Sequence, residues 1–284
     1  MDIKKVREKK AIPCIILGTW QITDRETLST LIDTAFREGY SAIDTAAAYF
    51  NELSIVRILK NYRIAREKIF LQSKVWNTNR GFLAVQEACK QSLKKLKTDY
   101  LNSYLIHWPA SPKLHKNWAE LNAETWRGME ELQKEGLVHS IGVCNFKAHH
   151  LFALEKTARV LPEILQIEFH IGMNTAEMAK VRDFCAQKNI ILQASSPLGN
   201  GQILKNEMLS KLAKKYRKSV AQIALKYALQ NKFCVIPKTA HCSRLKENID
   251  IFDFSLSEDE MKMLDKIEFC GGLNIDSDEV VQFE

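Results

Sequence analysis

Three apolar runs in the first half of the chain each end in a side chain that can carry or transfer a proton. One run ends in Asp44, the next in Lys74 and the third in His107, and Tyr49 follows Asp44 on the segment after the first run. An Asp at the end of a strand is held rigidly, and a Tyr on the following loop can lean over the strand ends. Taken alone, such a pair more often serves turn formation and core packing than chemistry.

Eight apolar, β-branched runs are predicted to form the strands that position these side chains. Amphipathic segments at helical spacing separate the runs. Strands that are buried on both faces and joined by short turns favour a closed α/β fold, a (β/α)8 TIM barrel, over an open doubly wound sheet. No G-x-G-x-x-G motif follows any run, which argues further against a Rossmann sheet. The runs cover residues 15–18, 41–45, 69–75, 100–107, 138–143, 164–169, 190–194 and 234–237.

The C-terminal ends of barrel strands meet at one end of the barrel, where the chemistry of this fold collects. A lysine that ends an apolar strand should be paired or exposed, and Asp44 on the neighbouring strand is the natural partner of Lys74. His107 would lie one strand further round. The other strand ends add Asn145, Ser195 and Lys238 to this group.

Additions to the barrel are expected at both ends of the chain. Residues 3–17 alternate loosely and include Pro13, which indicates an N-terminal β-hairpin. Two extra helices are predicted, one near 206–216 and one at 257–267. No linker or composition break is visible, so we expect one domain over 1–284.

Helix ends carry sequence signals that agree with this arrangement. Residues typical of the left-handed C-cap position are Gly39, Gly136, Asn189 and Asn231. Capping boxes are predicted at Ser219 with Gln222 and at Ser257 with Glu260.

Composition limits the class of protein. The net charge is +7, but lysines are spread beside Glu and Asp rather than clustered with aromatics, so we expect no nucleic-acid partner. The basic first ten residues lack an apolar segment, and no later run is long enough to cross a bilayer, so we expect neither a secretory signal nor a membrane partner. Seven cysteines without a C-x-x-C pair suit a reducing cytoplasm.

Six motifs, in order and in register, resemble those of the aldo-keto reductase family over nearly the whole chain. They are Asp44-Thr45-Ala-x-x-Tyr49-x-Asn51-Glu52, Ser73-Lys74-Val-Trp76, Ile106-His107-Trp108-Pro109, Gly142-Val143-x-Asn145-Phe146, Gln166-x-Glu168-x-His170 and Ile236-Pro237-Lys238. The chain looks like a compact, prokaryote-like member, similar to the 2,5-diketo-D-gluconate reductases.

The resemblance implies a catalytic tetrad of Asp44, Tyr49, Lys74 and His107 that reduces an aldehyde or ketone with NADPH. An unperturbed tyrosine titrates near pH ~10, so Tyr49 needs help to act as general acid. Lys74 is expected to stabilise its phenolate, and Asp44 to keep Lys74 charged and in place. His107 is expected to donate a hydrogen bond to the carbonyl oxygen.

Cofactor contacts are also implied by the resemblance. Lys238, Thr239 and Arg244 follow the last strand, and two cations with a hydroxyl suit a phosphate, so NADPH is preferred over NADH. The alternative interpretation is a basic helix start. The expected cofactor-binding residues are Thr19, Trp20, Cys144, Asn145, Gln166, Ser195, Ser196, Leu198, Lys238, Thr239, Arg244, Glu247 and Asn248.

Three positions depart from the family pattern. Cys144 replaces the usual serine, and a thiol is a weaker hydrogen-bond donor, so contact with the nicotinamide amide should depend mainly on Asn145 and Gln166. Ser195 stands where many members have an aromatic residue that stacks on the nicotinamide, which affects how the ring is held. Ile171 replaces a proline after His170.

Four aromatic residues that follow strand ends are expected to line the substrate pocket: Trp20, Phe50, Trp76 and Trp108. The connection after His107 and the C-terminal tail from Phe269 to Glu284 are short. Such loops set substrate choice in this family, and here they predict an open pocket for a small-molecule carbonyl substrate.

Two other functions compete with carbonyl reduction. A non-catalytic barrel that binds a nicotinamide cofactor, as a sensor or partner subunit, has no need of Tyr49 and His107 together. A metal-dependent hydrolase could use His139, His149 and His150, but no H-x-H stands at a strand end, and the adjacent histidines should point to different sides of a helix start. We therefore expect no metal, and we expect a monomer.

Overall fold

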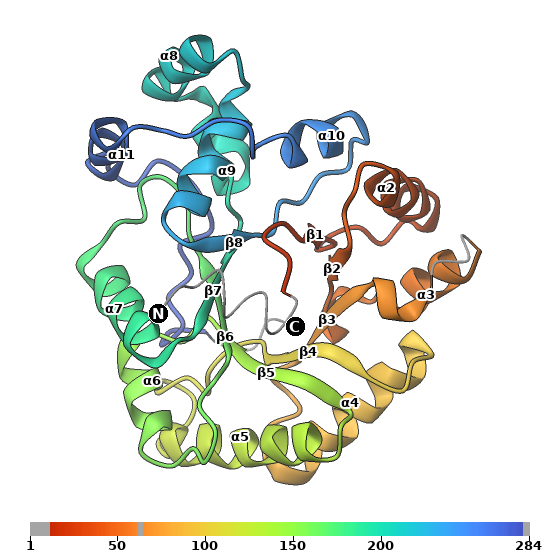
Figure 1. The fold of residues 1–284 in the computed structure, drawn as a ribbon. Helices are drawn as coiled ribbons and strands as arrows, with labels where there is room; N and C mark the ends of the chain where they lie inside the picture. The colour runs from red at the N-terminus through yellow and green to blue at the C-terminus, as the bar shows by residue number, and fades with distance from the viewer. Residues whose placement is uncertain (1–11, 62–64, 281–284) are drawn as a thin grey trace.

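The computed structural model describes residues 12–61 and 65–280 of the chain, and its centre is a ring of eight parallel strands (Figure 1). Each strand pairs with the next in sequence order. The strands are β1 (Leu17–Gly18), β2 (Ala42–Asp44), β3 (Phe70–Val75), β4 (Leu101–Ile106), β5 (Val138–Cys144), β6 (Ile164–Glu168), β7 (Ile191–Ser195) and β8 (Phe233–Val235).

Backbone hydrogen bonds between the first and last strands close the ring into a barrel. The amide of Ile16 donates to Val235 O at 2.9 Å, and the amide of Val235 donates to Cys14 O at 2.8 Å. Gly18 N donates to Pro237 O at 3.1 Å. The predicted (β/α)8 barrel is therefore confirmed, whereas the hairpin predicted over 3–17 falls mostly outside the described residues.

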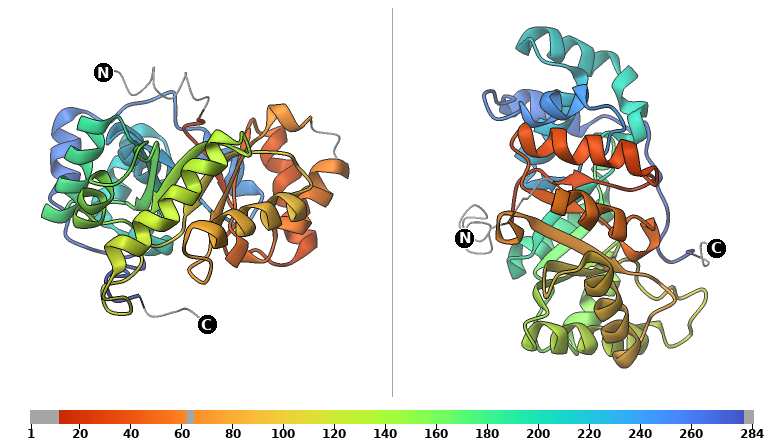
Figure 2. Two further views of the ribbon diagram at one scale, coloured as in Figure 1. Left: turned by 90° about the horizontal axis from the view of Figure 1, so that it is seen from below. Right: turned by 90° about the vertical axis from the view of Figure 1, so that its right-hand side faces the viewer.

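Helices surround the barrel in the two perpendicular views of Figure 2. Two of them, α8 (Glu207–Tyr216) and α11 (Glu258–Asp265), confirm the two predicted extra helices and lie at the edge of the molecule beside α9 (Val220–Gln230) (Figure 1). No described helix is long and apolar enough to cross a membrane. The other helices are α2 (Arg25–Arg37), α3 (Glu52–Asn61), α4 (Phe82–Leu96), α5 (Trp118–Lys134), α6 (Ala148–Glu155), α7 (Ala176–Lys188), α9 (Val220–Gln230) and α10 (Ser243–Ile249).

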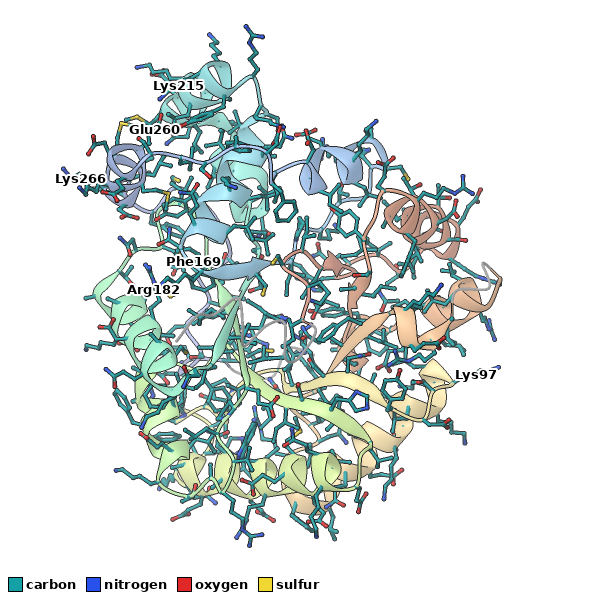
Figure 3. All side chains as sticks on the ribbon, viewed as in Figure 1. Lys97, Phe169, Arg182, Lys215, Glu260 and Lys266 are labelled. Atoms are coloured by element: carbon teal, nitrogen blue, oxygen red, sulfur yellow. The ribbon has the colours of Figure 1, made fainter. Side chains whose placement is uncertain are left out.

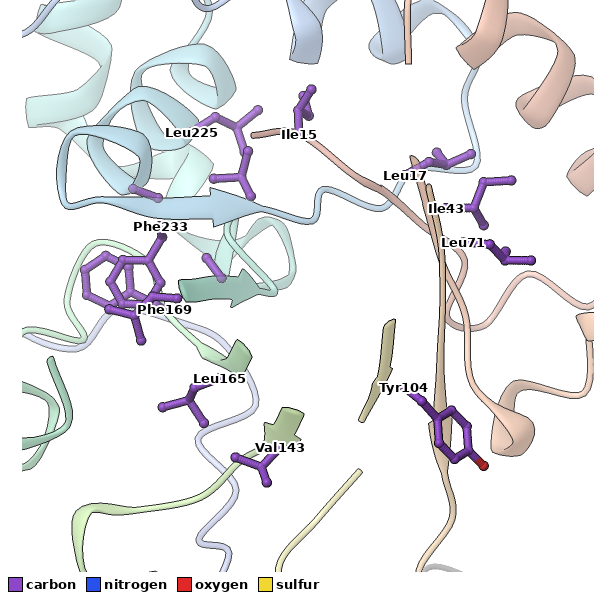
Figure 4. Packing of buried hydrophobic residues seen from close by; sticks show 14 of the residues in the cluster. Ile15, Leu17, Ile43, Leu71, Tyr104, Val143, Leu165, Phe169, Leu225 and Phe233 are labelled. Atoms are coloured by element: carbon purple, nitrogen blue, oxygen red, sulfur yellow. The ribbon is translucent and has the colours of Figure 1, made fainter. Parts of the chain in front are cut away.

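Successive residues of each strand alternate between two separate cores, because side chains along a strand point to opposite faces. The larger core fills the space between strands and helices, and it includes Leu17, Ile43, Leu71 and Leu165 (Figure 4). Burying each of these side chains stabilises the fold by about 1.5–3 kcal/mol. The smaller core lies inside the barrel and is formed by Ile12, Ile16, Ala42, Phe70, Leu105, Cys144, Ile164, Ile191, Cys234 and Ile236.

Most of the predicted helix ends are confirmed. Both capping boxes form, with reciprocal side-chain and backbone hydrogen bonds. Gly39, Gly136 and Asn189 have φ values of 97°, 77° and 59°. The prediction for Asn231 is wrong: its φ is −76°, because its amide still donates to Tyr227 O at 3.0 Å in the helical pattern. The left-handed residue is the next one, Lys232, at φ 69°.

Candidate active site

A cavity of about 1230 Å³ lies at the C-terminal ends of the strands. Asp44, Tyr49 and His107 of the predicted tetrad line it. The fourth member, Lys74, lies beneath the wall and is completely buried inside the barrel. The barrel therefore brings together four residues that come from three strands and the loop after β2.

The buried Lys74 links the Asp44 carboxylate to the hydroxyl of Tyr49. Its Nζ donates to Asp44 Oδ1 at 2.8 Å and to Oδ2 at 2.7 Å. The same Nζ lies 3.3 Å from the hydroxyl of Tyr49 and 3.0 Å from Thr45 O. The expected pairing of Lys74 with Asp44 is thus observed, in a place from which water is largely excluded.

Burial and charge act in opposite directions on this group. Burial disfavours the ammonium of Lys74, but the charge of Asp44 and its hydrogen bonds with Lys74 outweigh that effect and raise the pKa of Lys74 above its usual value. Burial raises the pKa of Tyr49 to about 12, although Lys74 opposes this rise. The prediction that Lys74 favours the phenolate holds in direction only. Because burial is the larger effect, Tyr49 stays a protonated phenol at neutral pH.

His107 stands beside Tyr49 as a neutral imidazole. Its ring centroid lies 5.6 Å from that of Tyr49 and 5.1 Å from that of Trp76, in edge-on contacts. Burial, reinforced by the charge of Lys74, holds the pKa of His107 well below its usual value. A neutral ring carries one N–H, so His107 can donate one hydrogen bond without becoming a competing acid.

The predicted cofactor-binding residues fall into two groups. Eight of them line the cavity, and the two cations among these, Lys238 and Arg244, are exposed and form no ion pair with a carboxylate in the described part of the chain. An unpaired cation pair on the wall fits a phosphate group of NADPH. The eight are Trp20, Asn145, Gln166, Ser195, Ser196, Leu198, Lys238 and Arg244.

The structure does not place the other five predicted cofactor contacts on the cavity wall. Thr19 is buried and donates to Asp44 O at 2.8 Å. Thr239 accepts a hydrogen bond from His241 N at 3.0 Å, and Asn248 is buried in α10. Glu247 accepts a hydrogen bond from Ser219.

Cys144 is the fifth of these residues, and it belongs to the apolar core inside the barrel. Burial raises the pKa of its thiol, with the charge of Lys74 opposing that rise. A protonated, enclosed thiol donates hydrogen bonds weakly. Asn145, the next residue, lines the cavity and donates from Nδ2 to His107 O at 3.0 Å.

All four aromatic residues predicted for the substrate pocket line the cavity. Phe50 is the most exposed of them, with 87% of its surface accessible, and its φ of 56° is unusual for a bulky residue. Trp76 contacts His107, so the apolar wall reaches that imidazole.

The C-terminal segment contributes more to the cavity than sequence reasoning indicated. Leu273, Asn274 and Ile275 line it together with Asp276 and Ser277. The segment is held by Glu168, whose carboxylate accepts from Leu273 N at 2.7 Å and from Asn274 N at 2.8 Å. The tail therefore forms one side of the cavity. The sequence motif Gln166-x-Glu168-x-His170 includes the carboxylate that holds the tail, but the spacing of the motif does not show which segment Glu168 contacts.

The adjacent histidines of α6 do not point to different sides, as the sequence suggested. Their ring centroids lie 4.0 Å apart, and Nε2 of each lies 3.1 Å from Asp278 Oδ1. Nδ1 of His150 accepts the amide of Lys147 at 3.1 Å, so its proton stands on Nε2, the nitrogen that faces Asp278. This tautomer opposes metal ligation through Nε2. His139 lies elsewhere, stacked on Tyr100 at 4.4 Å.

Comparison with characterised sequences identifies related proteins over almost the full length. The model of the Aldo/keto reductase family matches residues 14–268. Glyoxal reductase of Bacillus subtilis (strain 168) is 40% identical over 266 residues, which are 94% of this chain and 92% of the relative. Methylglyoxal reductase DkgA of Escherichia coli (strain K12) is 39% identical over 277 residues, which are 97% and 96% of the two chains.

Solved structures agree with these relatives. An aldo/keto reductase from Brucella melitensis is 39% identical with a TM-score of 0.82, and the match covers 90% of this chain and 95% of that one. A point mutant of Gox0644 in complex with NADPH is 33% identical with a TM-score of 0.85, and the match covers 94% of each chain.

Proposed function

Because the chain belongs to the aldo/keto reductase family, and is an oxidoreductase that reduces carbonyl groups with NADPH, we propose that Tyr49 is its general acid and that its substrates are short 2-oxoaldehydes. One observation carries the first part. Lys74 Nζ lies 3.3 Å from the Tyr49 hydroxyl and 2.7 Å from Asp44, at the bottom of a cavity lined by His107.

The residues of the site have separate roles in this mechanism. NADPH, when bound, supplies the hydride, which leaves negative charge on the former carbonyl oxygen. His107 donates a hydrogen bond to that oxygen and orients the substrate. Tyr49 then gives its proton to the oxygen. Lys74 stabilises the phenolate that remains, and Asp44 holds Lys74 in position.

We propose that NADPH lies along the wall formed by the ends of β5 to β8. Asn145 and Gln166 would bind the nicotinamide carboxamide, and Ser195 and Ser196 would hold the adjoining part of the cofactor, since all four line the cavity. The side chains of Lys238 and Arg244 would hold the 2′-phosphate, since both are exposed on the same wall and form no ion pair with a described carboxylate.

Two relatives support the substrate class. They are named as a glyoxal reductase and a methylglyoxal reductase, and each matches over more than nine tenths of both chains. Trp20, Trp76 and Trp108 line the same cavity as Tyr49 and would give a small carbonyl substrate an apolar wall.

The test is to follow NADPH oxidation with methylglyoxal by the wild type and by Tyr49→Phe. Removing the acid should lower kcat by about 100-fold or more. A matched control is Tyr104→Phe, which removes the hydroxyl of a buried tyrosine on the outer face of β4 and should retain wild-type kcat. Equal turnover by Tyr49→Phe and the wild type would contradict the assignment of the acid. Turnover of other aldehydes but not of methylglyoxal or glyoxal would contradict the substrate class.

We also propose that the chain is a single domain and a cytoplasmic monomer that binds no nucleic acid. Every described strand belongs to one sheet, which supports the single domain. The structure describes all seven cysteines and joins none of them in a disulfide, which suits a reducing compartment. Gel filtration with light scattering would contradict the monomer if it gave twice the mass of 32.6 kDa.

A further inference from the structure

We infer that Gln72 of β3 is a positioning residue that holds the Asp44 carboxylate in place for Lys74 and Tyr49. Its side chain is fully buried inside the barrel and donates from Nε2 to Asp44 Oδ1 at 2.6 Å. That contact is shorter than either contact from Lys74 to the same carboxylate, at 2.8 and 2.7 Å. The inference rests on the proposed roles of Tyr49 and Lys74.

The amide of Gln72 is locked in one orientation by its neighbours. The carbonyl oxygen accepts from Ser103 Oγ at 2.6 Å and from Gln193 Nε2 at 3.1 Å. The amide nitrogen donates to Asp44 and also to Gln193 Oε1 at 2.9 Å. A flipped amide would place its oxygen against the carboxylate, so the donor must face Asp44.

Gln193 extends the network across the barrel to the strand that carries Gln166. Its Oε1 accepts from Gln72 and, at 3.1 Å, from Gln166 Nε2. Gln166 Nε2 in turn donates to Asp44 Oδ1 at 3.1 Å. Asp44 Oδ1 therefore accepts three donors, from Lys74, Gln72 and Gln166, at buried positions.

This network matters for the reaction because the orientation of Asp44 determines where Lys74 lies. Lys74 Nζ is shared between both carboxylate oxygens, Thr45 O and the Tyr49 hydroxyl. Without Gln72, Asp44 Oδ1 keeps Lys74 and Gln166 but loses its shortest hydrogen bond, and we expect the carboxylate to turn and to draw Lys74 away from Tyr49. A hydrogen bond to a buried charge contributes about tenfold to 100-fold in an equilibrium or rate.

The experiment measures the single-turnover rate of NADPH oxidation with an aldehyde, because product release can hide the chemical step in kcat. Gln72→Met keeps the length of the side chain and removes its polar atoms. It should lower the rate by about tenfold to 100-fold, with the KM for NADPH within about threefold of wild type. The matched control is Ile191→Val, a packing change inside the same barrel that should leave the rate within about twofold.

Gln72→Glu supplies a signature that a purely structural role would not produce. Two carboxyl groups at this distance cannot both ionise, and only the protonated form of the new group can donate to Asp44. The rate of this variant should therefore rise as the pH falls, whereas the rate of Gln72→Met should stay low and should not change with pH. If Gln72→Met does not fold, the Ser103→Ala variant tests the role of Gln72 instead. It removes only the hydroxyl that orients Gln72, and it should slow the reaction by about threefold to tenfold.

Each remaining outcome overturns the inference. A wild-type rate in folded Gln72→Met, an equal loss in Ile191→Val, or a pH-independent rate in Gln72→Glu would show that Gln72 serves packing alone. The Tyr49→Phe variant, measured in parallel, separates the two proposals. If it is as active as wild type, the proposed acid is wrong and the role of Gln72 falls with it. If it is inactive while Gln72→Met is not, only the role of Gln72 is wrong.

Discussion

The acid–base behaviour of Tyr49 results from two opposed effects on one hydroxyl. Burial raises its pKa to about 12, and Lys74 only partly compensates. His107, whose pKa lies well below its usual value, is neutral over the same range. In the proposed mechanism Tyr49 is therefore the proton donor, and His107 acts only as a hydrogen-bond donor. The two groups differ in role because burial favours the uncharged form of each.

The pH dependence of the two reaction directions follows from this. Reduction uses protonated Tyr49, so its single-turnover rate should be flat from about pH 6 to pH 10 and fall only as the pH nears 12. Oxidation of the alcohol uses the phenolate, so its rate should rise about tenfold per pH unit over the same range. Stopped-flow measurements in both directions check this. A fall in the rate of reduction between pH 7 and pH 8 would contradict it.

At the scale of elements, the C-terminal segment depends on one glycine. Gly272 has a φ of 102°, and a Cβ at this position would overlap Glu168 Oε1 and His170 Nε2. The close approach lets Glu168 accept the amides of Leu273 and Asn274. Close packing at Gly272 and hydrogen bonds to Glu168 therefore both fix where the tail lies on the cavity wall.

Gly272→Ala should displace this segment and raise the KM for the aldehyde by about threefold or more, with a loss of stability of about 1–3 kcal/mol. The control is Gly136→Ala, which has the same kind of backbone strain at φ 77° but no atom within 4 Å of the added Cβ. It should lower the melting temperature without changing KM. If KM changes equally in both variants, the contact with Glu168 does not set the tail.

The two extra helices are joined by Glu260 of α11, which contacts α8 (Figure 3). Its carboxylate accepts from Lys215 Nζ at 2.6 Å and from the Tyr216 hydroxyl at 2.5 Å. Burial opposes its charge, but these hydrogen bonds outweigh that effect and lower the pKa of Glu260 to about 2. A carboxyl whose pKa is lowered by folding stabilises the protein above its unfolded pKa of about 4.3.

Glu260→Gln should accordingly lower the free energy of unfolding by about 1–3 kcal/mol at pH 7. The difference from wild type should shrink as the pH falls from about 5 towards 2, because the wild-type carboxylate becomes protonated over that range. Urea denaturation at a series of pH values measures it. A difference that does not depend on pH would show that the charge of Glu260 contributes nothing to this contact.

At the scale of the whole molecule, NADPH that binds at the strand ends should stabilise the folded barrel against unfolding. A ligand that binds only the folded state adds about 2.7 kcal/mol at 100 times its Kd, which corresponds to about 5–10 °C in melting temperature. NADPH should produce this shift in the wild type. In Arg244→Leu the shift with NADPH should be smaller, and the shift with NADH should be unchanged, because NADH lacks the 2′-phosphate. Equal NADPH shifts in both proteins would exclude Arg244 as a phosphate ligand.

Much of this architecture is predictable from the chain alone. The alternation of apolar runs with amphipathic segments specifies eight strands and their helices, because burial requires that periodicity whatever the tertiary detail. The grouping of Asp44, Lys74 and His107 follows as well, since strand ends of a barrel meet at one place, whereas the tetrad that includes Tyr49 was implied by the family resemblance. Asn231 shows the limit of such reasoning, because one additional helical hydrogen bond moved the left-handed turn to Lys232.

Only the tertiary structure decided which distant groups meet. Gln72 and Gln193 lie 121 residues apart and bond across the barrel axis, and Glu168 holds a tail 105 residues away. The tertiary structure also decided how far burial raises the pKa of Tyr49, since this depends on how completely the surrounding strands and loops exclude water. Local sequence specifies a strand and the direction of its side chains, whereas closure of the barrel determines which side chains face each other inside it. That closure therefore sets the acidity of Tyr49 and the partners of Asp44.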